Sequence, residues 1–288
     1  MQVVSRFAPS PTGRLHLGHA YSALLAHDYA RSRGGAFLLR IEDIDPGRTR
    51  SEFVDGIIED LSWLGLRWDG EILFQSDRLP LYAAALGKLK EQEFVYPCFC
   101  TRSTIAAEIA ASASAPHGPD GPLYPGTCRR LLPEERERRR AAEPHAWRLD
   151  VAKAVASAGP LYWHDGDTEV QAEPEAFGDV VLARKDAPTS YHLAVTVDDA
   201  AQGVTDVVRG RDLYAATDVH RLLQALLRLP TPAYHHHPLL LDAAGRRLAK
   251  RHGAPTLASL RAAGADPAAL AADLRAGRLP AGYSAAGA

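Results

Sequence analysis

The chain has 288 residues, of which 46% are hydrophobic and 24% charged, a composition typical of globular proteins. Its formal net charge of −2 argues against a broadly basic nucleic-acid-binding surface but leaves room for a local basic stripe. No apolar run approaches the roughly 20 residues that span a bilayer, and the N-terminus has no apolar signal core. We therefore expect a cytoplasmic protein that has no membrane partner.

The first predicted elements alternate between strand and helix. Apolar patterning predicts a strand at 3–7, a helix at 15–33 and a second strand at 37–41. Helical periodicity then predicts helices at 53–64 and 79–91. This alternation favours an α/β fold in which helices cover a parallel sheet.

The composition changes at Pro97. From there to about Pro144 the chain carries all three cysteines, a loop rich in proline and glycine, and a charged run at 134–140. Such a run is typical of the solvated face of a helix, although its arginines could also meet RNA phosphate. This region is predicted to be an insertion between two halves of a nucleotide-binding fold.

Strand signals return at 146–151 and 179–185, and a helix at 218–229 precedes a further strand at 238–241. These elements predict the second half of the sheet. Beyond Pro255 two short Ala-rich helical segments follow, broken at residues 264–267. We therefore divide the chain into a first nucleotide-binding half, an insertion with acceptor-binding elements, a second half and a helical extension, at 1–96, 97–178, 179–254 and 255–288.

Residues 6–19 carry the strongest signal and read Arg-Phe-Ala-Pro-Ser-Pro-Thr-Gly-Arg-Leu-His-Leu-Gly-His. A strand here leads through a turn into a helix, and the first amides of a helix lack internal partners and attract anions. Gly18 would let a nucleotide approach the backbone, and the imidazoles of His16 and His19 could donate to phosphate oxygens. The alternative is a capped helix with two ordinary surface histidines.

This stretch resembles the first signature of class I aminoacyl-tRNA synthetases, commonly His-Ile-Gly-His, and its first eight residues resemble the glutamyl branch. Further motifs follow in the family's order, at 34–45, 191–194, 198–199, 203–210 and 247–251. The resemblance implies a Rossmann-like class I synthetase catalytic domain with a parallel sheet, a zinc-binding insertion and a short helical C-terminal extension. It also implies that ATP enters with Mg²⁺.

A glutamate substrate needs arginine for its carboxylates and an acid for its ammonium. By resemblance, Arg6 and Arg209 hold carboxylate, Glu42 holds the ammonium and Tyr191 hydrogen-bonds the ligand. Taken singly, Glu42 and Asp43 could instead pair with Arg40 or Arg48, and Tyr191 could lie in the core. Val195 replaces an asparagine of glutamyl enzymes, so we expect weaker or differently posed glutamate binding. The implied glutamate site comprises Arg6, Phe7, Ala8, Pro9, Ser10, Glu42, Tyr191 and Arg209.

The nucleotide site follows from the same resemblance. Lys250 lies in a basic loop flanked by glycines, suited to closing over triphosphate, although such a loop can also be a solvated turn. The family form is Lys-Met-Ser-Lys-Ser or Lys-Leu-Ser-Lys-Arg; here Arg247 replaces the first lysine and Ala249 the serine. The implied ATP site comprises His16, Gly18, His19, His236, Arg247 and Lys250.

The three cysteines offer soft metal ligands. Cys98, Cys100 and Cys128 could bind one zinc ion with a fourth ligand, for which imidazole is the commoner choice. The alternative is two buried cysteines and an incidental thiol. Candidates for the fourth ligand are His117, Tyr124 and His145. The family resemblance favours Tyr124 in a Cys-x-Cys, Tyr, Cys site, with His117 in reserve, and implies one structural zinc per chain.

Roughly 35 residues follow Lys250, too few for an anticodon-reading module of ordinary domain size. The chain resembles a truncated branch of the family, the glutamyl-queuosine tRNA(Asp) synthetases, which have valine at the position of Val195. This implies an AMP-forming ligase, expected to be a monomer, that activates L-glutamate without tRNA and transfers it to queuosine in the tRNA(Asp) anticodon stem-loop. Alternatives are a minimal tRNA-charging glutamyl-tRNA synthetase, a nucleotidyltransferase of the same fold, and an inactive zinc-stabilised RNA-binding module.

Overall fold

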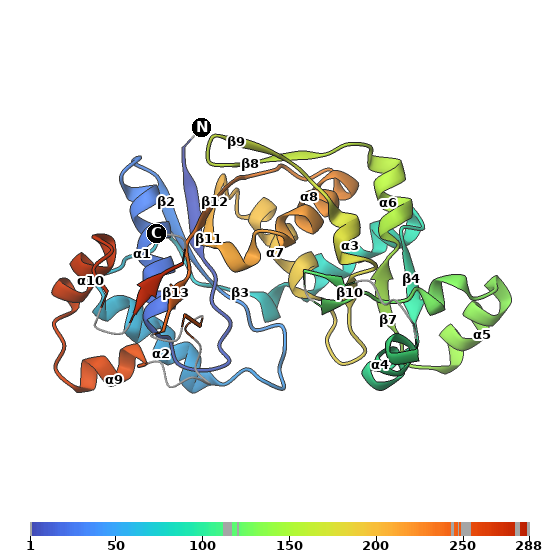
Figure 1. The fold of residues 1–288 in the computed structure, drawn as a ribbon, viewed down its shortest axis with the longest axis horizontal. Coiled ribbons are helices and arrows are strands. Elements are labelled where there is room, and N and C mark those ends of the chain that lie inside the picture. The colour runs from blue at the N-terminus through green and yellow to red at the C-terminus, as the bar shows by residue number, and fades with distance from the viewer. Residues whose placement is uncertain are drawn as a thin grey trace.

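A parallel sheet runs through the middle of the molecule (Figure 1). The computed structural model describes residues 2–111, 117–119, 121–242, 245–246, 248, 255–279 and 283–286. The parallel strands are β1 (Val4–Phe7), β2 (Ala36–Ile41), β3 (Leu73–Phe74), β8 (Tyr162–Asp165), β11 (Asp206–Gly210) and β12 (Ala233–His237). Strand β2 lies between β1 and β3, and β12 lies between β11 and β8.

Hydrogen bonds at one point join the two groups of strands. The Thr205 amide donates to the Val4 carbonyl at 2.9 Å, and the Val4 amide donates to Thr205 Oγ1 at 2.8 Å. Thr205 immediately precedes β11, so β1 and β11 start side by side. In open α/β sheets, ligands bind outside the carboxyl ends of neighbouring strands where the strand order reverses. The junction between β1 and β11 therefore predicts the position of the site.

Helix α1 (Leu17–Arg31) packs against β1, β2 and β11. Its inner face carries fully buried alanines, whose small side chains bring the helix axis close to the sheet. These residues are Ala20, Ala23, Ala26 and Ala30. Their close packing fixes the position of the helix N-terminus, where the histidine motif lies.

Three helices form a second packed group beside the sheet (Figure 1). They are α3 (Leu79–Glu91), α7 (Tyr191–Ala201) and α8 (Ala216–Leu227), and all three contact one another. Helix α2 (Ser51–Trp63) lies elsewhere, against α9 (Leu257–Ala262). The two largest apolar clusters among the described residues lie around α1, β1 and β2 and around α3 and α8.

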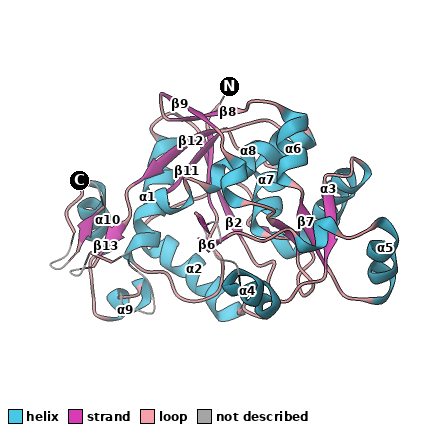
Figure 2. Ribbon diagram, turned by 45° about the vertical axis from the view of Figure 1, so that its right-hand side comes forward, coloured by secondary structure: helices cyan, strands magenta, loops and turns pink. Residues whose placement is uncertain are grey.

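The inserted region has its own antiparallel sheet, in which β7 (Ala146–Leu149) lies between β4 (Val95–Cys98) and β10 (Val181–Ala183). The hairpin of β8 and β9 (Thr168–Gln171) returns to the parallel sheet beside β12. The remaining elements are α4 (Arg102–Ala111), β5 (His117–Gly118), β6 (Gly121–Pro122), α5 (Pro133–Ala142) and α6 (Val151–Ala158). Figure 2 shows α4 and α5 at the periphery of the ribbon.

The C-terminal extension packs back on the first half of the chain. It comprises α9, α10 (Pro267–Arg275) and β14 (Ser284–Ala285), which pairs with β13 (Leu240–Leu241). The Leu257 amide donates to the Leu15 carbonyl at 2.9 Å, beside the histidine motif. Within the described part of the chain, no helix has the length and apolar character that crossing a membrane requires.

The sequence located the early elements well. The two helices expected after Pro255 are present as α9 and α10, with the break between them. Six other predicted elements are confirmed to within two residues at each end: the strands at 3–7 and 37–41 and the helices at 15–33, 53–64, 79–91 and 218–229.

The prediction for the second half of the sheet was partly wrong. The strands expected at 146–151 and 179–185 are β7 and β10, which belong to the antiparallel sheet of the insertion. The strand expected at 238–241 is confirmed only in its second half, as β13, and the sequence missed the preceding strand β12, whose last three residues are histidines. These polar side chains are tolerated in a sheet because each has a hydrogen-bond partner, namely Asp206, Asp165 and Ser22.

Candidate functional site

A cavity of about 420 Å³ opens where β1 and β11 end. All eight residues of the implied glutamate site line it, together with three of the implied ATP site, His16, Gly18 and His19. Further lining residues are Thr12, Tyr21, Ser22, Val208, Gly210, Asp212, Leu213, His237, Pro238, Leu239, Leu240 and Leu248. Arg247 and Lys250 lie outside the described residues. Residues that are far apart in the chain thus meet at one site.

The two motif histidines cap α1 with their side chains. The Gly18 amide donates to His16 Nδ1 at 3.1 Å, and the His16 amide donates to His19 Nδ1 at 3.1 Å. Because each Nδ1 accepts, the ring proton of each neutral imidazole sits on Nε2. The rings lie 3.9 Å apart, centroid to centroid. A Cβ on Gly18 would come within 3.0 Å of the His16 ring, so the glycine leaves room for this arrangement.

This cap changes the expected role of the helix amides. The amides of Gly18 and His19 donate to the side chain and the carbonyl of His16, respectively. They are therefore engaged inside the protein, contrary to the expectation that they are open to phosphate. The ring donors of this motif are the Nε2–H groups of His16 and His19, two residues that line the cavity.

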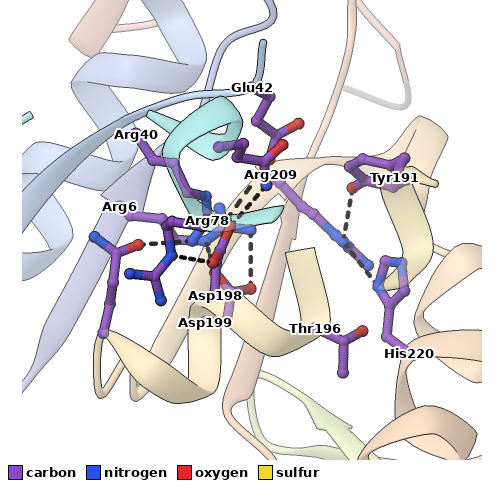
Figure 3. A network of polar contacts seen from close by, with 12 residues as sticks. Arg6, Arg40, Glu42, Arg78, Tyr191, Thr196, Asp198, Asp199, Arg209 and His220 are labelled. Atoms are coloured by element: carbon purple, nitrogen blue, oxygen red, sulfur yellow. Dashed lines mark hydrogen bonds and ion pairs between the residues drawn. The ribbon is translucent and has the colours of Figure 1, made fainter. Parts of the chain in front are cut away.

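A buried carboxylate holds two arginines below the cavity (Figure 3). Asp199 accepts from Arg6 Nε at 3.0 Å and from Arg6 Nη2 at 3.3 Å, and Arg40 Nη2 donates to it at 2.8 Å. The Arg40 side chain is fully buried and that of Arg6 is 5% exposed. Burial alone would favour the neutral acid, but the two guanidinium groups outweigh it and hold the pKa of Asp199 below its usual value.

Asp198 anchors the same helix to a second set of groups. Its carboxylate accepts from Gln75 at 2.8 Å, from Arg78 at 2.6 Å and from Tyr82 at 2.6 Å. Asp198 and Asp199 follow one another on α7, yet they face different partners. The pair therefore ties α7 to β1 and β2 on one side and to α3 and the 3₁₀ turn before it on the other.

Glu42 follows β2 and lines the cavity. Its amide donates to the Pro9 carbonyl at 3.0 Å, which fixes it beside the signature loop, and its carboxylate lies 3.6 Å from Arg40. Burial raises the pKa of Glu42 to about 7, with Arg40 and Arg6 opposing the rise. The group is thus poised to ionise when a cation arrives. The expected alternative of a pair with Arg40 is also present, as this longer contact.

Arg209, on β11, is surrounded by neutral acceptors and is 5% exposed. Nη2 donates to Thr217 Oγ1 at 2.7 Å and to the Leu213 carbonyl at 3.0 Å. Figure 3 shows its guanidinium between Tyr191 and His220, which accept from Nη1 at 3.4 Å each. Tyr191 thereby lies at the cavity wall and not in the apolar core.

The structure corrects the assignment of His236. Its side chain is fully buried behind the site, where it lies 3.0 Å from Asp165 and accepts from Arg209 Nε at 3.2 Å. The neighbouring His237 lines the cavity instead and contacts Ser22 Oγ at 3.0 Å. Successive side chains of a strand point to opposite faces, so an error of one residue moves the assigned histidine out of the pocket.

The three cysteines meet in the insertion. Their Sγ atoms all lie within 4.8 Å of one another, and Cys100 and Cys128 are 3.5 Å apart. Tyr124 Oη lies 3.5 Å from the Sγ atoms of both Cys98 and Cys100. A tetrahedral zinc ion with Zn–S distances of about 2.3 Å sets its sulfur ligands about 3.8 Å apart. The four side chains therefore fit one such ion.

His145, another candidate for the fourth ligand, has other partners. His145 lies with Nδ1 3.0 Å from the Glu143 carbonyl and packs its ring against Trp147. The side chain of His117 lies outside the description. Tyr124 is thus the described candidate closest to the sulfur atoms.

Several residues of the site carried no recognised signal in the sequence. Asp212 and Ser22 line the cavity from a 3₁₀ turn and from α1, and neither belongs to a motif of the family. His237 could have been found by testing each histidine of the run 235–237 in turn. The supports of Arg209, above all His220 and Thr217, become visible when the fold brings α8 to β11.

The chain matches known proteins over nearly its whole length. The family model described as tRNA synthetases class I (E and Q), catalytic domain, matches residues 2–282. A curated relative from Rhodobacter capsulatus, named glutamyl-Q tRNA(Asp) synthetase, is 52% identical over 277 residues, which cover 92% of this chain and 97% of the relative. A relative of the same name from Deinococcus radiodurans is 48% identical and covers 95% of this chain and 88% of its own length.

Solved structures show the same relationship. A crystal structure of a glutamate tRNA ligase from Elizabethkingia meningosepticum, in complex with its amino acid, has a TM-score of 0.73 and 28% identity to this chain. The match covers 88% of this chain and 53% of that one, so the chain spans about half the length of the ligase. The chain therefore belongs to the class I tRNA synthetase (E and Q) catalytic-domain family and is a ligase of the aminoacyl-tRNA synthetase type.

Proposed function

We propose that this protein activates L-glutamate with Mg²⁺-ATP, without tRNA, and transfers the glutamyl group to queuosine in the anticodon of tRNA(Asp). The observation that carries the proposal is the single cavity in which a carboxylate-binding set, Arg6 and Arg209, adjoins the histidine pair at the start of α1. The names of relatives that are 48–52% identical support the choice of acceptor.

In the first step, an oxygen of the glutamate α-carboxylate attacks the α-phosphorus of ATP, and the bond to the bridging oxygen breaks to release pyrophosphate. Arg6 and Arg209 hold the carboxylates and Glu42 holds the ammonium, so the attacking oxygen is oriented. The Nε2–H groups of His16 and His19 donate to phosphate oxygens as charge accumulates there. Arg247 and Lys250 remain proposed partners of the triphosphate, and Mg²⁺ would enter bound to it.

In the second step, a hydroxyl of the queuosine cyclopentene ring attacks the glutamyl carbonyl and AMP leaves. This acceptor distinguishes the proposal from a minimal tRNA-charging synthetase, in which the terminal ribose would attack. The tRNA partner would present its anticodon stem-loop to the mouth of the cavity. That the protein acts as a cytoplasmic monomer stays a prediction from the sequence.

Pyrophosphate exchange tests the first step. With ATP, Mg²⁺ and glutamate but no tRNA, we expect labelled pyrophosphate to enter ATP. No exchange without tRNA would contradict the proposal, and exchange would exclude an inactive RNA-binding module. A nucleotidyltransferase would show exchange only with its own nucleotidyl acceptor, and glutamate would not support it.

Digestion of the product to nucleosides tests the second step. After incubation with labelled glutamate and queuosine-containing tRNA(Asp), we expect the label on the modified nucleoside. Label on the 3′-terminal adenosine would identify a tRNA-charging enzyme instead. Matched tRNA(Asp) that lacks queuosine serves as the control and should stay unlabelled.

We also propose that Cys98, Cys100, Tyr124 and Cys128 hold one structural zinc ion. The ion would link β4 to the loop before α5 and so stabilise a segment with few apolar contacts. We expect Cys100→Ser to lower the zinc content, measured by atomic emission, to under about a tenth of an equivalent and to destabilise the insertion. His145→Asn is the control and should retain zinc. Full zinc in Cys100→Ser would refute the ligand set.

A further inference from the structure

Arg209 differs from the other buried arginines of the site in what surrounds it. Arg6 and Arg40 both contact the carboxylate of Asp199. In the part of the chain that the structure describes, Arg209 makes five hydrogen bonds, and none of its acceptors is a carboxylate: Tyr191 Oη, His220 Nδ1, His236 Nε2, Thr217 Oγ1 and the Leu213 carbonyl. Charges buried in proteins are usually paired, so this arrangement calls for an external anion.

The two histidines are held neutral by their own hydrogen bonds. A guanidinium group can only donate, so His220 Nδ1 and His236 Nε2 must both accept from Arg209. His220 Nε2 then donates to His192 Nδ1 at 3.2 Å, and His236 Nδ1 donates to Asp165 at 3.0 Å. Burial, together with repulsion from Arg209, lowers the pKa of His236 to about 4 and that of His220 well below its usual value.

The buried arginines of the cavity differ in their carboxylate partners. Arg6 and Arg40 are matched by Asp199 and by Glu42 when that group ionises. Asp198 is matched by Arg78, whereas Arg209 has no carboxylate among its hydrogen-bond acceptors. Glutamate carries one net negative charge at neutral pH and glutamine carries none. The side chain of the acid can supply Arg209 with a carboxylate partner and that of the amide cannot, so the arrangement favours the acid over its amide.

We infer that His220 and His236 are positioning residues that fix the Arg209 guanidinium through neutral acceptors and so reserve its charge for a substrate carboxylate. The inference rests on the proposed use of glutamate. It attributes part of the selectivity for glutamate over glutamine to residues behind the pocket. Their side chains accept hydrogen bonds from Arg209 without carrying a charge. An acidic residue in place of either histidine would form an ion pair with Arg209 inside the protein. It would thus replace the substrate carboxylate.

A matched pair of variants at His220 tests this. Asparagine and aspartate have the same shape and place an oxygen near the position of Nδ1, but aspartate brings a charge. We expect His220→Asn to raise the KM for glutamate by less than about threefold, and His220→Asp to raise it at least tenfold further while the KM for ATP stays unchanged. His220→Asp should also reduce the factor by which the protein prefers glutamate over glutamine as substrate. Equal glutamate KM values in the two variants would overturn the inference.

A second measurement needs no substrate. If Arg209 lacks an internal counter-ion, His220→Asp should unfold at a higher temperature than His220→Asn at pH 7. An equal or lower unfolding midpoint for His220→Asp would contradict the inference. The matched pair Thr217→Asp and Thr217→Asn repeats both tests at the 2.7 Å contact with Nη2, in case the first pair fails to fold. Failure of the proposed function would appear separately, as wild-type protein that lacks glutamate-dependent exchange.

Discussion

Replacing Asp199 with asparagine is expected to lower the free energy of unfolding by about 3–5 kcal/mol. The variant keeps the shape of the side chain but removes the charge that faces Arg6 and the fully buried Arg40. Arg40 would keep Gln202 Oε1 as an acceptor at 2.8 Å, but its remaining carboxylate contact is Glu42, at 3.6 Å, whose ionisation is itself opposed by burial. A guanidinium without a counter-ion in a dry interior costs far more than the loss of one hydrogen bond. Thermal or urea denaturation at pH 7 measures the change.

A surface ion pair of similar geometry provides the control. Asp186 contacts Arg184 at 2.6 Å, but its side chain is 67% exposed. Asp186→Asn should therefore cost no more than about 1 kcal/mol, because water screens the pair. Combining Asp199→Asn with Arg40→Met should recover part of the lost stability by removing the uncompensated charge. If Asp199→Asn and Asp186→Asn destabilise equally, burial of the Arg40 pair does not govern stability.

The sequence predicts most accurately those helices and strands whose pattern lies within their own residues. The predicted bounds of α3 match the observed ones, because its apolar spacing is regular and Pro80 lies in its first turn. Helix α7 and strand β11 were recognised as motifs but not as elements, although Ser190 caps α7 and accepts from Leu193. Which sheet a strand joins depends on distant partners, so the pairing of β10 with β7 was not predictable from its own residues.

Residues of the site, too, were predictable only where they lie in a recognisable motif. Arg6, Glu42 and Arg209 could be assigned by resemblance because they lie in motifs, and the structure brings them to one cavity. Their supports come from elements distant in sequence: Asp199 from α7, His220 from α8 and Asp165 from the hairpin of the insertion. A sequence pattern does not encode such contacts. The charge state of Glu42 likewise depends on burial, which the fold creates.

Glutamate binding is expected to release about half a proton at pH 7, because the free protein holds Glu42 with a pKa of about 7 and the ligand ammonium favours the ionised form. The sign follows from linkage: a ligand that binds the carboxylate form lowers the pKa, so affinity falls as the pH drops below 7. The loss should approach tenfold per pH unit below about pH 6. Of the charged groups nearby, Arg40 has a pKa above its usual value and Asp199 a pKa below its usual value, so neither titrates in this range.

Calorimetric titration of glutamate in buffers with different ionisation enthalpies measures the released proton directly. Glu42→Gln is the matched control, since it retains the shape and one acceptor oxygen but cannot ionise. It should bind glutamate about 10- to 100-fold more weakly, bind ATP with little change, and show no proton release near pH 7. Release of the same size from wild type and Glu42→Gln would place the titrating group elsewhere, and unchanged glutamate affinity would remove Glu42 from the ammonium site. Both results depend on the burial of a carboxylate that lies between two arginines and a cavity, so they test the geometry of the site and its chemistry together.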